Sequence, residues 1–141
     1  MTGNTILIVE DCLFIGEQLR AMLEGLTNVG SVDLSTDCYS AIKRLANFFP
    51  DLVLLDIHLP GCSGLDLLRY IKRWHPVTDV VILTNEVDNY YRRKCKELGA
   101  AYFMDKSSDF CHVPDIVSSM LQTNACPIIK NRPKPMGRLR V

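Results

Sequence analysis

Five short apolar runs alternate along the chain with longer segments that have helical periodicity. The runs at 5–10, 51–56 and 79–84 are almost continuously apolar, which is typical of strands covered on both faces. The run at 29–35 is more polar and contains Gly30, which favours an edge strand, and 100–106 forms the fifth run. The alternation predicts an α/β domain with helices on both faces of a five-stranded parallel sheet.

The expected helices lie between these runs, and the chain changes character after the last of them. Apolar residues fall on one stripe in 12–26 and again in 64–74, and Pro114 suits the first turn of a final helix. Residues 123–141 contain three prolines, five basic residues and no acids. We therefore expect a domain over residues 1–122 followed by a flexible, basic C-terminal tail.

Charge and hydropathy exclude several classes of protein. Residues 1–129 carry 11 basic and 16 acidic residues, a formal net charge of −5, and the five remaining basic residues follow them. Five charges without an aromatic platform disfavour direct nucleic-acid binding. No apolar stretch reaches membrane-spanning length and no secretory signal is recognisable, so we expect a cytoplasmic protein without membrane contact.

The six cysteines are scattered singly, without a CxxC pair or zinc-ligand spacing. This pattern predicts reduced and mostly packed thiols. Cys12 and Cys62 are expected near the carboxyl ends of the strands, where a redox input is the alternative to simple packing. No adjacent cation favours a lowered thiol pKa there, so packing remains the expectation.

Polar residues stand at the ends of four of the five apolar runs. Ligands of open parallel sheets bind outside the carboxyl ends of the strands, so these side chains should share one rim. Three clustered carboxylates repel one another less when they share a hard cation such as Mg²⁺. A carboxylate can also be a nucleophile toward phosphorus, with an ammonium and a hydroxyl stabilising the phosphoryl oxygens. The residues are Glu10, Asp11, Asp56, Thr84 and Lys106.

The segment after Asp56 reads IHLPGCSG, and its proline and glycines predict a sharp turn. Such a turn leads the chain away from the rim. The carboxylate at the tip of the buried strand would therefore stay accessible.

These residues together resemble the receiver domain of bacterial response regulators. The resemblance rests on Glu10 and Asp11, on Asp56 followed by LPGCSG, on Thr84, and on FMDKS with Lys106. It covers residues 5 to about 122. It implies the flavodoxin-like (βα)5 receiver fold, with the strand order 2-1-3-4-5 taken from the family.

The resemblance also implies roles for the site residues. Asp56 would accept a phosphoryl group from a sensor histidine kinase or a histidine phosphotransfer protein. Asp11, Asp56 and the backbone carbonyl of His58 would hold Mg²⁺, with Glu10 acting partly through water. Thr84 would donate its hydroxyl to the phosphoryl group, and Lys106 would pair with that group or with Asp56.

A switch is implied as well. Phe103 falls at the aromatic position that turns inward when Thr84 moves, while His58 and Glu86 would flank the phosphoryl group and affect its lifetime. Ser107 stands where the family often has proline, so the cis peptide common there is in doubt. The fourth helix, fifth strand and fifth helix would form the surface for a downstream protein, or for a phosphorylation-dependent dimer.

The favoured interpretation is a stand-alone receiver in two-component signalling, a phosphoacceptor switch that catalyses only its own phosphorylation and dephosphorylation. Residues after 122 leave no room for an output domain, although the chain could be a receiver fragment of a longer transcription regulator. A Mg²⁺-dependent aspartyl-phosphate phosphohydrolase is the alternative enzyme. Its nucleophile would be expected on the first strand rather than at Asp56, with an aspartate where His58 stands. In a flavodoxin-like redox protein, EDCLF after the first strand would repel a flavin phosphate.

Overall fold

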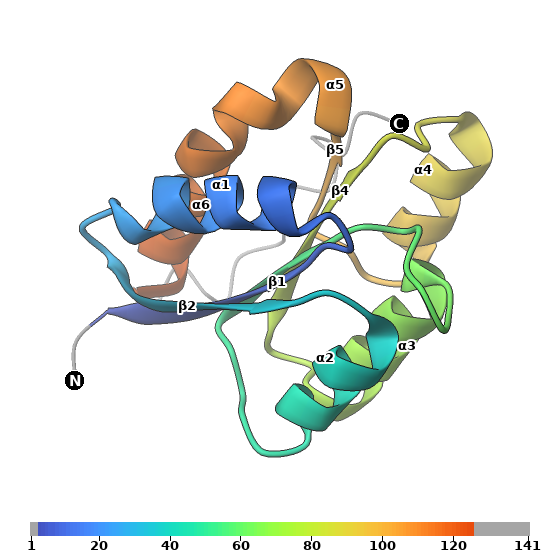
Figure 1. Ribbon diagram of the computed structural model, residues 1–141, viewed down its shortest axis with the longest axis horizontal. Helices are drawn as coiled ribbons and strands as arrows, with labels where there is room; N and C mark the ends of the chain where they lie inside the picture. The colour runs from blue at the N-terminus through green and yellow to red at the C-terminus, as the bar shows by residue number, and fades with distance from the viewer. Residues whose placement is uncertain (1–2, 126–141) are drawn as a thin grey trace.

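The computed structural model describes residues 3–125 of the 141-residue chain. It contains a five-stranded parallel sheet in the order β2-β1-β3-β4-β5, which confirms the predicted flavodoxin-like receiver fold and its strand order (Figure 1). The strands are β1 (Asn4–Val9), β2 (Val29–Ser35), β3 (Leu52–Leu55), β4 (Asp79–Thr84) and β5 (Tyr102–Asp105).

Helices cover both faces of the sheet, as predicted (Figure 1). One face carries α1 (Leu13–Glu24) and α6 (Val113–Ala125), and the other carries α2 (Cys38–Leu45), α3 (Gly64–Trp74) and α4 (Asn89–Glu97). A short α5 (Lys106–Asp109) and a 3₁₀ turn, η1 (Phe110–His112), connect β5 to α6. These two turns were not expected. The predicted fifth helix corresponds to α6.

Burial of the strands follows their sequence character. Every residue of β3 and β4 is buried, whereas only Val32 and Ser35 are buried in β2, at the edge of the sheet. Two apolar layers result, one on each face of the sheet. Leu7, Leu55 and Ile82 belong to the layer under α2 and α3, and Ile8, Leu54 and Leu83 to the layer under α1 and α6.

The predicted tail is only partly described. Residues 123–125 continue α6, so the helix extends three residues beyond the expected domain end at residue 122. The rest of the predicted tail, 126–141, lies outside the described residues. Within residues 3–125, no helix has both the length and the apolar character needed to cross a membrane.

The prediction that all cysteines are reduced is wrong for two of them. A disulfide joins Cys38, the first residue of α2, to Cys62 in the turn between β3 and α3. The two residues lie 24 positions apart in the sequence. Their turns meet because both follow strands at the carboxyl edge of the parallel sheet. Cys12, Cys95 and Cys111 are free, but only Cys95 is buried.

Candidate functional site

A cavity of about 290 Å³ lies at the carboxyl ends of the central strands. Its lining combines three carboxylates, a hydroxyl and an ammonium from segments far apart in the chain. The sequence-predicted residues that line it are Glu10, Asp11, Asp56, His58, Thr84 and Lys106. Phe103 and Glu86, which were also predicted, are not part of this lining.

Three carboxylates form the acidic side of the cavity. One oxygen each from Glu10, Asp11 and Asp56 lies within 4.8 Å of the other two. Glu10 and Asp56 are buried, while Asp11 is exposed. A hard cation such as Mg²⁺ prefers oxygen ligands and keeps several waters, so this half-open donor set fits it.

Lys106 balances part of this negative charge. Its Nζ lies 2.8 Å from Glu10 Oε1 and 2.8 Å from Asp56 Oδ2. All three side chains are largely shielded from solvent. The ammonium therefore bridges the two buried carboxylates and leaves the exposed Asp11 on the open side.

The ionisation of Glu10 and Lys106 reflects this burial. Burial raises the pKa of Glu10 above its ordinary value, and the hydrogen bonds from Lys106 and from the backbone N–H of Cys12 oppose the rise. Burial would lower the pKa of Lys106, but the hydrogen bonds to Asp56 and Glu10 outweigh it and raise that pKa. Lys106 therefore stays positively charged next to the acidic cluster.

The turn after Asp56 is folded back tightly on the strand. The backbone N–H of His58 donates to Asp56 Oδ1 at 3.2 Å, and His58 pairs with Ser63 in an isolated antiparallel bridge. A side chain at Gly64 would collide with the backbone of Asp56 and Ile57. Ser63 then caps α3 by accepting the N–H of Leu65. The predicted sharp turn is confirmed, and it fixes the carboxylate at the strand tip.

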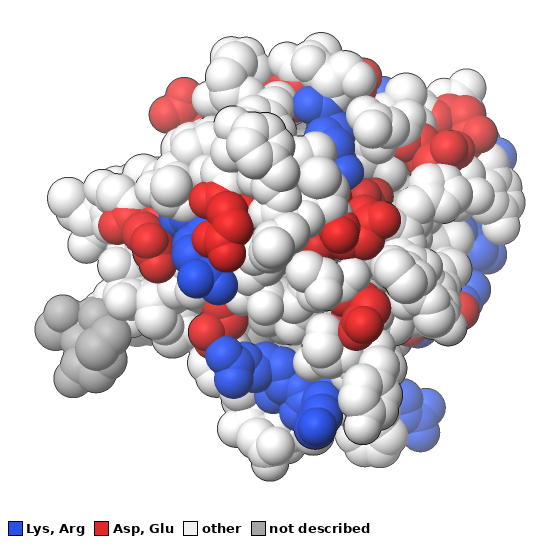
Figure 2. Space-filling model, viewed as in Figure 1, with Lys and Arg blue, Asp and Glu red and all other residues white. Residues whose placement is uncertain are grey.

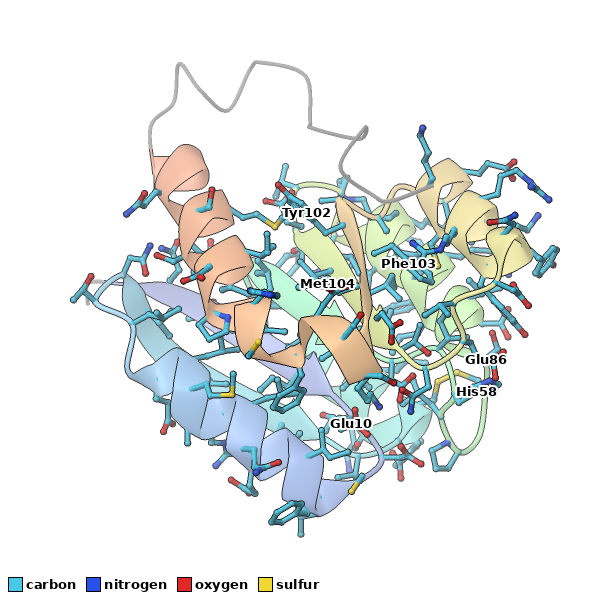
Figure 3. All side chains as sticks on the ribbon, turned by 90° about the horizontal axis from the view of Figure 1, so that it is seen from above. Glu10, His58, Glu86, Tyr102, Phe103 and Met104 are labelled. Atoms are coloured by element: carbon cyan, nitrogen blue, oxygen red, sulfur yellow. A yellow bond between two sulfur atoms is a disulfide. The ribbon has the colours of Figure 1, made fainter. Side chains whose placement is uncertain are left out.

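Thr84 ends β4 fully buried, and its Oγ1 accepts the backbone N–H of Glu86 at 3.2 Å. The hydroxyl therefore lies at the rim while it orders the turn that follows. Glu86 does not line the cavity, but its Oε2 lies 3.0 Å from Nε2 of His58, which does. Figure 3 shows these two side chains beside each other.

Phe103 is already inside the protein. It is 1% exposed and packs in the layer of α2, α3 and α4, with the guanidinium of Arg92 about 5.0 Å from its ring centre. Tyr102 and Met104 point to the opposite face, toward α6 (Figure 3). Of these three neighbours, Phe103 is thus the one on the α4 side of the sheet, and its role as a switch stays a prediction.

One contact at the site was not predicted. The hydroxyl of Ser107 lies 3.2 Å from Asn85 Oδ1 and joins the turn after β5 to the turn after β4. No peptide bond is cis among the described residues, so the doubt about a cis peptide at Ser107 was justified. The only sequence signal for the contact between Ser107 and Asn85 was the serine itself, which stands where the family often has proline.

Figure 2 shows acidic and basic side chains interspersed on the viewed face, with basic side chains gathered over α2, which carries Lys43 and Arg44. Arg44 is itself paired with Asp33 at 2.7 Å.

Comparison with known proteins identifies the family. A family model described as the response regulator receiver domain matches residues 6–118. The response regulator GacA of Pseudomonas aeruginosa is 32% identical over 73% of this chain and 48% of its own length. A protein-glutamate methylesterase/protein-glutamine glutaminase of Geobacter sulfurreducens is 30% identical over 72% of this chain and 27% of its own length.

Solved structures agree on the fold. A CheY-like receiver domain protein from Methanospirillum hungatei matches with a TM-score of 0.81 and 21% identity, covering 88% of this chain and 98% of that one. A LuxR-family response regulator from Aurantimonas matches with a TM-score of 0.77 and 26% identity, covering 86% of each chain. The chain spans from about a quarter to about half the length of the two curated relatives named above.

Proposed function

This chain belongs to the response regulator receiver domain family of two-component signalling, and from that premise we propose that Asp56 accepts a phosphoryl group from a sensor histidine kinase or a histidine phosphotransfer protein. The observation that carries the proposal is the bridge of Lys106 between Asp56 and Glu10. It places a buried cation against the proposed nucleophile in an otherwise acidic cavity. In the transfer, an Asp56 oxygen bonds to phosphorus as the bond from phosphorus to the donor histidine breaks.

Asp11, Asp56 and the backbone carbonyl of His58 would hold Mg²⁺, with Glu10 reaching it partly through water. The cluster of carboxylate oxygens within 4.8 Å supports this assignment. Bound Mg²⁺ supplies positive charge beside the oxygens of the transferred phosphoryl group. The exposed carboxylate of Asp11 leaves the cavity open to the cation and to a phosphodonor.

Lys106 and Thr84 would stabilise the phosphoryl group once it is on Asp56. Phosphorylation would bond an Asp56 oxygen to phosphorus and remove the negative charge of the carboxylate that Lys106 contacts, so the Lys106 ammonium would pair with a phosphoryl oxygen instead. The Thr84 hydroxyl would turn from the Glu86 backbone to donate to another. His58, which lines the cavity, and Glu86, which pairs with it, would flank the phosphoryl group and affect how fast water reaches it.

Movement of Thr84 would carry the signal to a protein-binding surface. Thr84 precedes the turn to α4, and Phe103 packs beneath that helix next to Arg92. We expect phosphorylation to change the packing of Phe103 and so the surface of α4, β5 and α6. A downstream protein, or a second copy of the phosphorylated chain, would bind there.

This function makes the chain a phosphoacceptor switch in the cytoplasm, and its chemistry is limited to its own phosphorylation and dephosphorylation. This chain covers only 48% and 58% of the length of two of its relatives. That partial coverage supports an alternative, in which the chain is the receiver domain of a longer regulator. The methylesterase activity named for other relatives belongs to proteins of which this chain spans about a quarter.

Beryllofluoride, which mimics a phosphoryl group, tests the switch. Backbone amide NMR spectra would be recorded with Mg²⁺ alone and with Mg²⁺ and beryllofluoride. We expect shifts near Asp56 and Thr84 and also in α4 and β5, and loss of the α4 shifts in Thr84→Ala. Shifts confined to the turn after Asp56 in the wild type would contradict a switch.

A further inference from the structure

The Cys38–Cys62 disulfide joins the start of α2 to the turn between β3 and α3. A backbone hydrogen bond also links these two segments. The two Cα atoms are 5.9 Å apart, which is ordinary for a disulfide. The backbone N–H of Cys38 donates to the carbonyl of Pro60 at 3.3 Å. Because this hydrogen bond does not depend on sulfur, the two thiols would remain neighbours after reduction and could pair again.

The segment that the disulfide holds is the turn after Asp56. It contains Gly61 at a φ of +91°, and it is closed by the bridge between His58 and Ser63. His58 is two residues from Asp56, and its carbonyl is the backbone ligand proposed for Mg²⁺. The tip of the turn is thus fastened to α2, while its base carries groups of the phosphorylation site.

The two sulfurs differ in access. Cys38 is 4% exposed and packs in the apolar layer, while Cys62 is partly exposed. Cys62 also lines a cavity of about 360 Å³ together with His58, Leu59 and the tyrosines of α4. A small thiol or disulfide reagent would therefore reach Cys62 first.

We propose that Cys38 and Cys62 form a reversible redox site, whose disulfide tethers the turn after Asp56 to α2. In oxidation, the Cys62 thiolate attacks glutathione disulfide and releases one glutathione. The Cys38 thiolate then attacks the Cys62 sulfur, forms the Cys38–Cys62 bond and releases the second glutathione. Two electrons pass to glutathione disulfide, the two protons of the cysteine thiols end on glutathione, and excess glutathione reverses the exchange.

The consequence for phosphorylation rests on the proposed function of Asp56. A disulfide restricts the conformations open to the segment it closes. If the reduced turn keeps the His58 carbonyl in place for about a third of the time, the apparent affinity for Mg²⁺ falls about threefold. Oxidation would then favour phosphoryl acceptance by preorganising the turn.

The test compares protein treated with glutathione disulfide with protein treated with reduced glutathione. Peptide mapping without reduction identifies the linked pair, and hydrogen exchange measures the backbone of residues 57–63. Labelling with acetyl phosphate at subsaturating Mg²⁺ gives a separate readout. Cys62→Ser removes the bond while it keeps the buried Cys38. Cys111→Ser removes an exposed free cysteine outside the pair and is the matched control.

We expect a Cys38–Cys62 peptide only after oxidation, slower exchange of residues 57–63 in that form, and about threefold faster labelling. Cys62→Ser should behave as the reduced protein in both treatments, and Cys111→Ser as the wild type. Absence of the linked peptide after oxidation, or equal exchange in linked and reduced protein, would overturn the proposal. If hydrogen exchange of residues 57–63 differed between oxidised and reduced protein but acetyl phosphate labelled neither, the result would support the disulfide tether. It would count against the proposed phosphoacceptor function of Asp56.

Discussion

Lys106 and Asp56 lie 50 residues apart in the sequence, yet the lysine Nζ is 2.8 Å from Asp56 Oδ2. The same ammonium lies 2.8 Å from Glu10 Oε1. Two carboxylates and one ammonium that come from three different strand ends therefore form one charge cluster. This cluster links the fold of the parallel sheet to the chemistry proposed for the site.

Lys106→Met should destabilise the metal-free protein. The change leaves the Glu10 and Asp56 carboxylates without their shared cation, and loss of a partner in such a shielded pair costs about 1–3 kcal/mol. Urea unfolding in the presence of EDTA measures the effect. Lys43→Met, on the exposed side of α2, is the control and should change the free energy of unfolding little. Equal stabilities of Lys106→Met and the wild type would show that the bridge is energetically unimportant.

Mg²⁺ should stabilise the folded protein because it binds the native carboxylate cluster. At ten times the dissociation constant, binding to the native state alone adds about 1.4 kcal/mol to the free energy of unfolding. Thermal unfolding with increasing Mg²⁺ measures this, and Asp11→Asn should lose most of the increase. Asp66→Asn, an exposed carboxylate in α3, should keep it. A Mg²⁺ effect of the same size in Asp11→Asn would argue against the proposed ligand set.

Gly64→Ala should destabilise the protein and displace the strand end that carries Asp56. A β-carbon at this position would collide with the backbone of Asp56 and Ile57, which cannot rotate away as a side chain could. Overpacking of this kind costs about 1–3 kcal/mol. At Gly25 the nearest atom would be 3.7 Å from an added β-carbon, so Gly25→Ala is the matched control. Chemical denaturation checks both, and a Gly64→Ala protein as stable as Gly25→Ala would contradict the close packing.

The parallel sheet was predictable because burial of strands on both faces produces continuous apolar runs, whereas the strand order came from the resemblance to the family. The runs at 51–56 and 79–84 contain the fully buried strands β3, residues 52–55, and β4, residues 79–84. The same logic placed Glu10, Asp56, Thr84 and Lys106 at one rim, since parallel strands end at a common edge. Their chemical roles came from resemblance to a family and remain predictions.

Other features could not be predicted because they depend on distances that sequence spacing does not encode. The Cys38–Cys62 pair forms between the turns after two strands that are not neighbours, so single cysteines gave no sign of it. The short α5 and η1 depend on local hydrogen bonds, such as Asp105 accepting the N–H of Ser107. The contact of Arg92 with the Phe103 ring, at about 5.0 Å, joins α4 to β5 and likewise depends on packing between distant segments.

Stability should fall when the pH drops below about 6.5, the ordinary pKa of histidine in the unfolded chain. Burial lowers the pKa of His75 in the folded protein, against a weaker opposing hydrogen bond to the Leu45 backbone. Its Nδ1 is buried without a hydrogen-bond partner among the described residues. The histidine in the unfolded chain therefore binds a proton at a higher pH than His75 in the folded protein does. Acid thus favours unfolding, and the stability that the neutral His75 contributes is present near neutral pH and lost as the pH falls.

Urea unfolding at pH 7 and pH 5.5 measures this dependence. The fall in stability should be smaller in His75→Gln, which cannot gain a proton. His112→Gln, at an exposed histidine, should resemble the wild type. If His75→Gln lost as much stability as the wild type over this range, His75 would not be the group responsible.

The central claim is that Asp56 is the phosphoacceptor, and intact mass spectrometry after incubation with acetyl phosphate tests it most directly. The wild type, Asp56→Asn and the control Asp51→Asn, at the start of the same buried run, would each be incubated with Mg²⁺ and with EDTA. We predict a gain of one phosphoryl group in the wild type and in Asp51→Asn, only with Mg²⁺, and no gain in Asp56→Asn. An equal gain in Asp56→Asn, or no gain in the wild type under conditions that label another receiver domain, would contradict the claim.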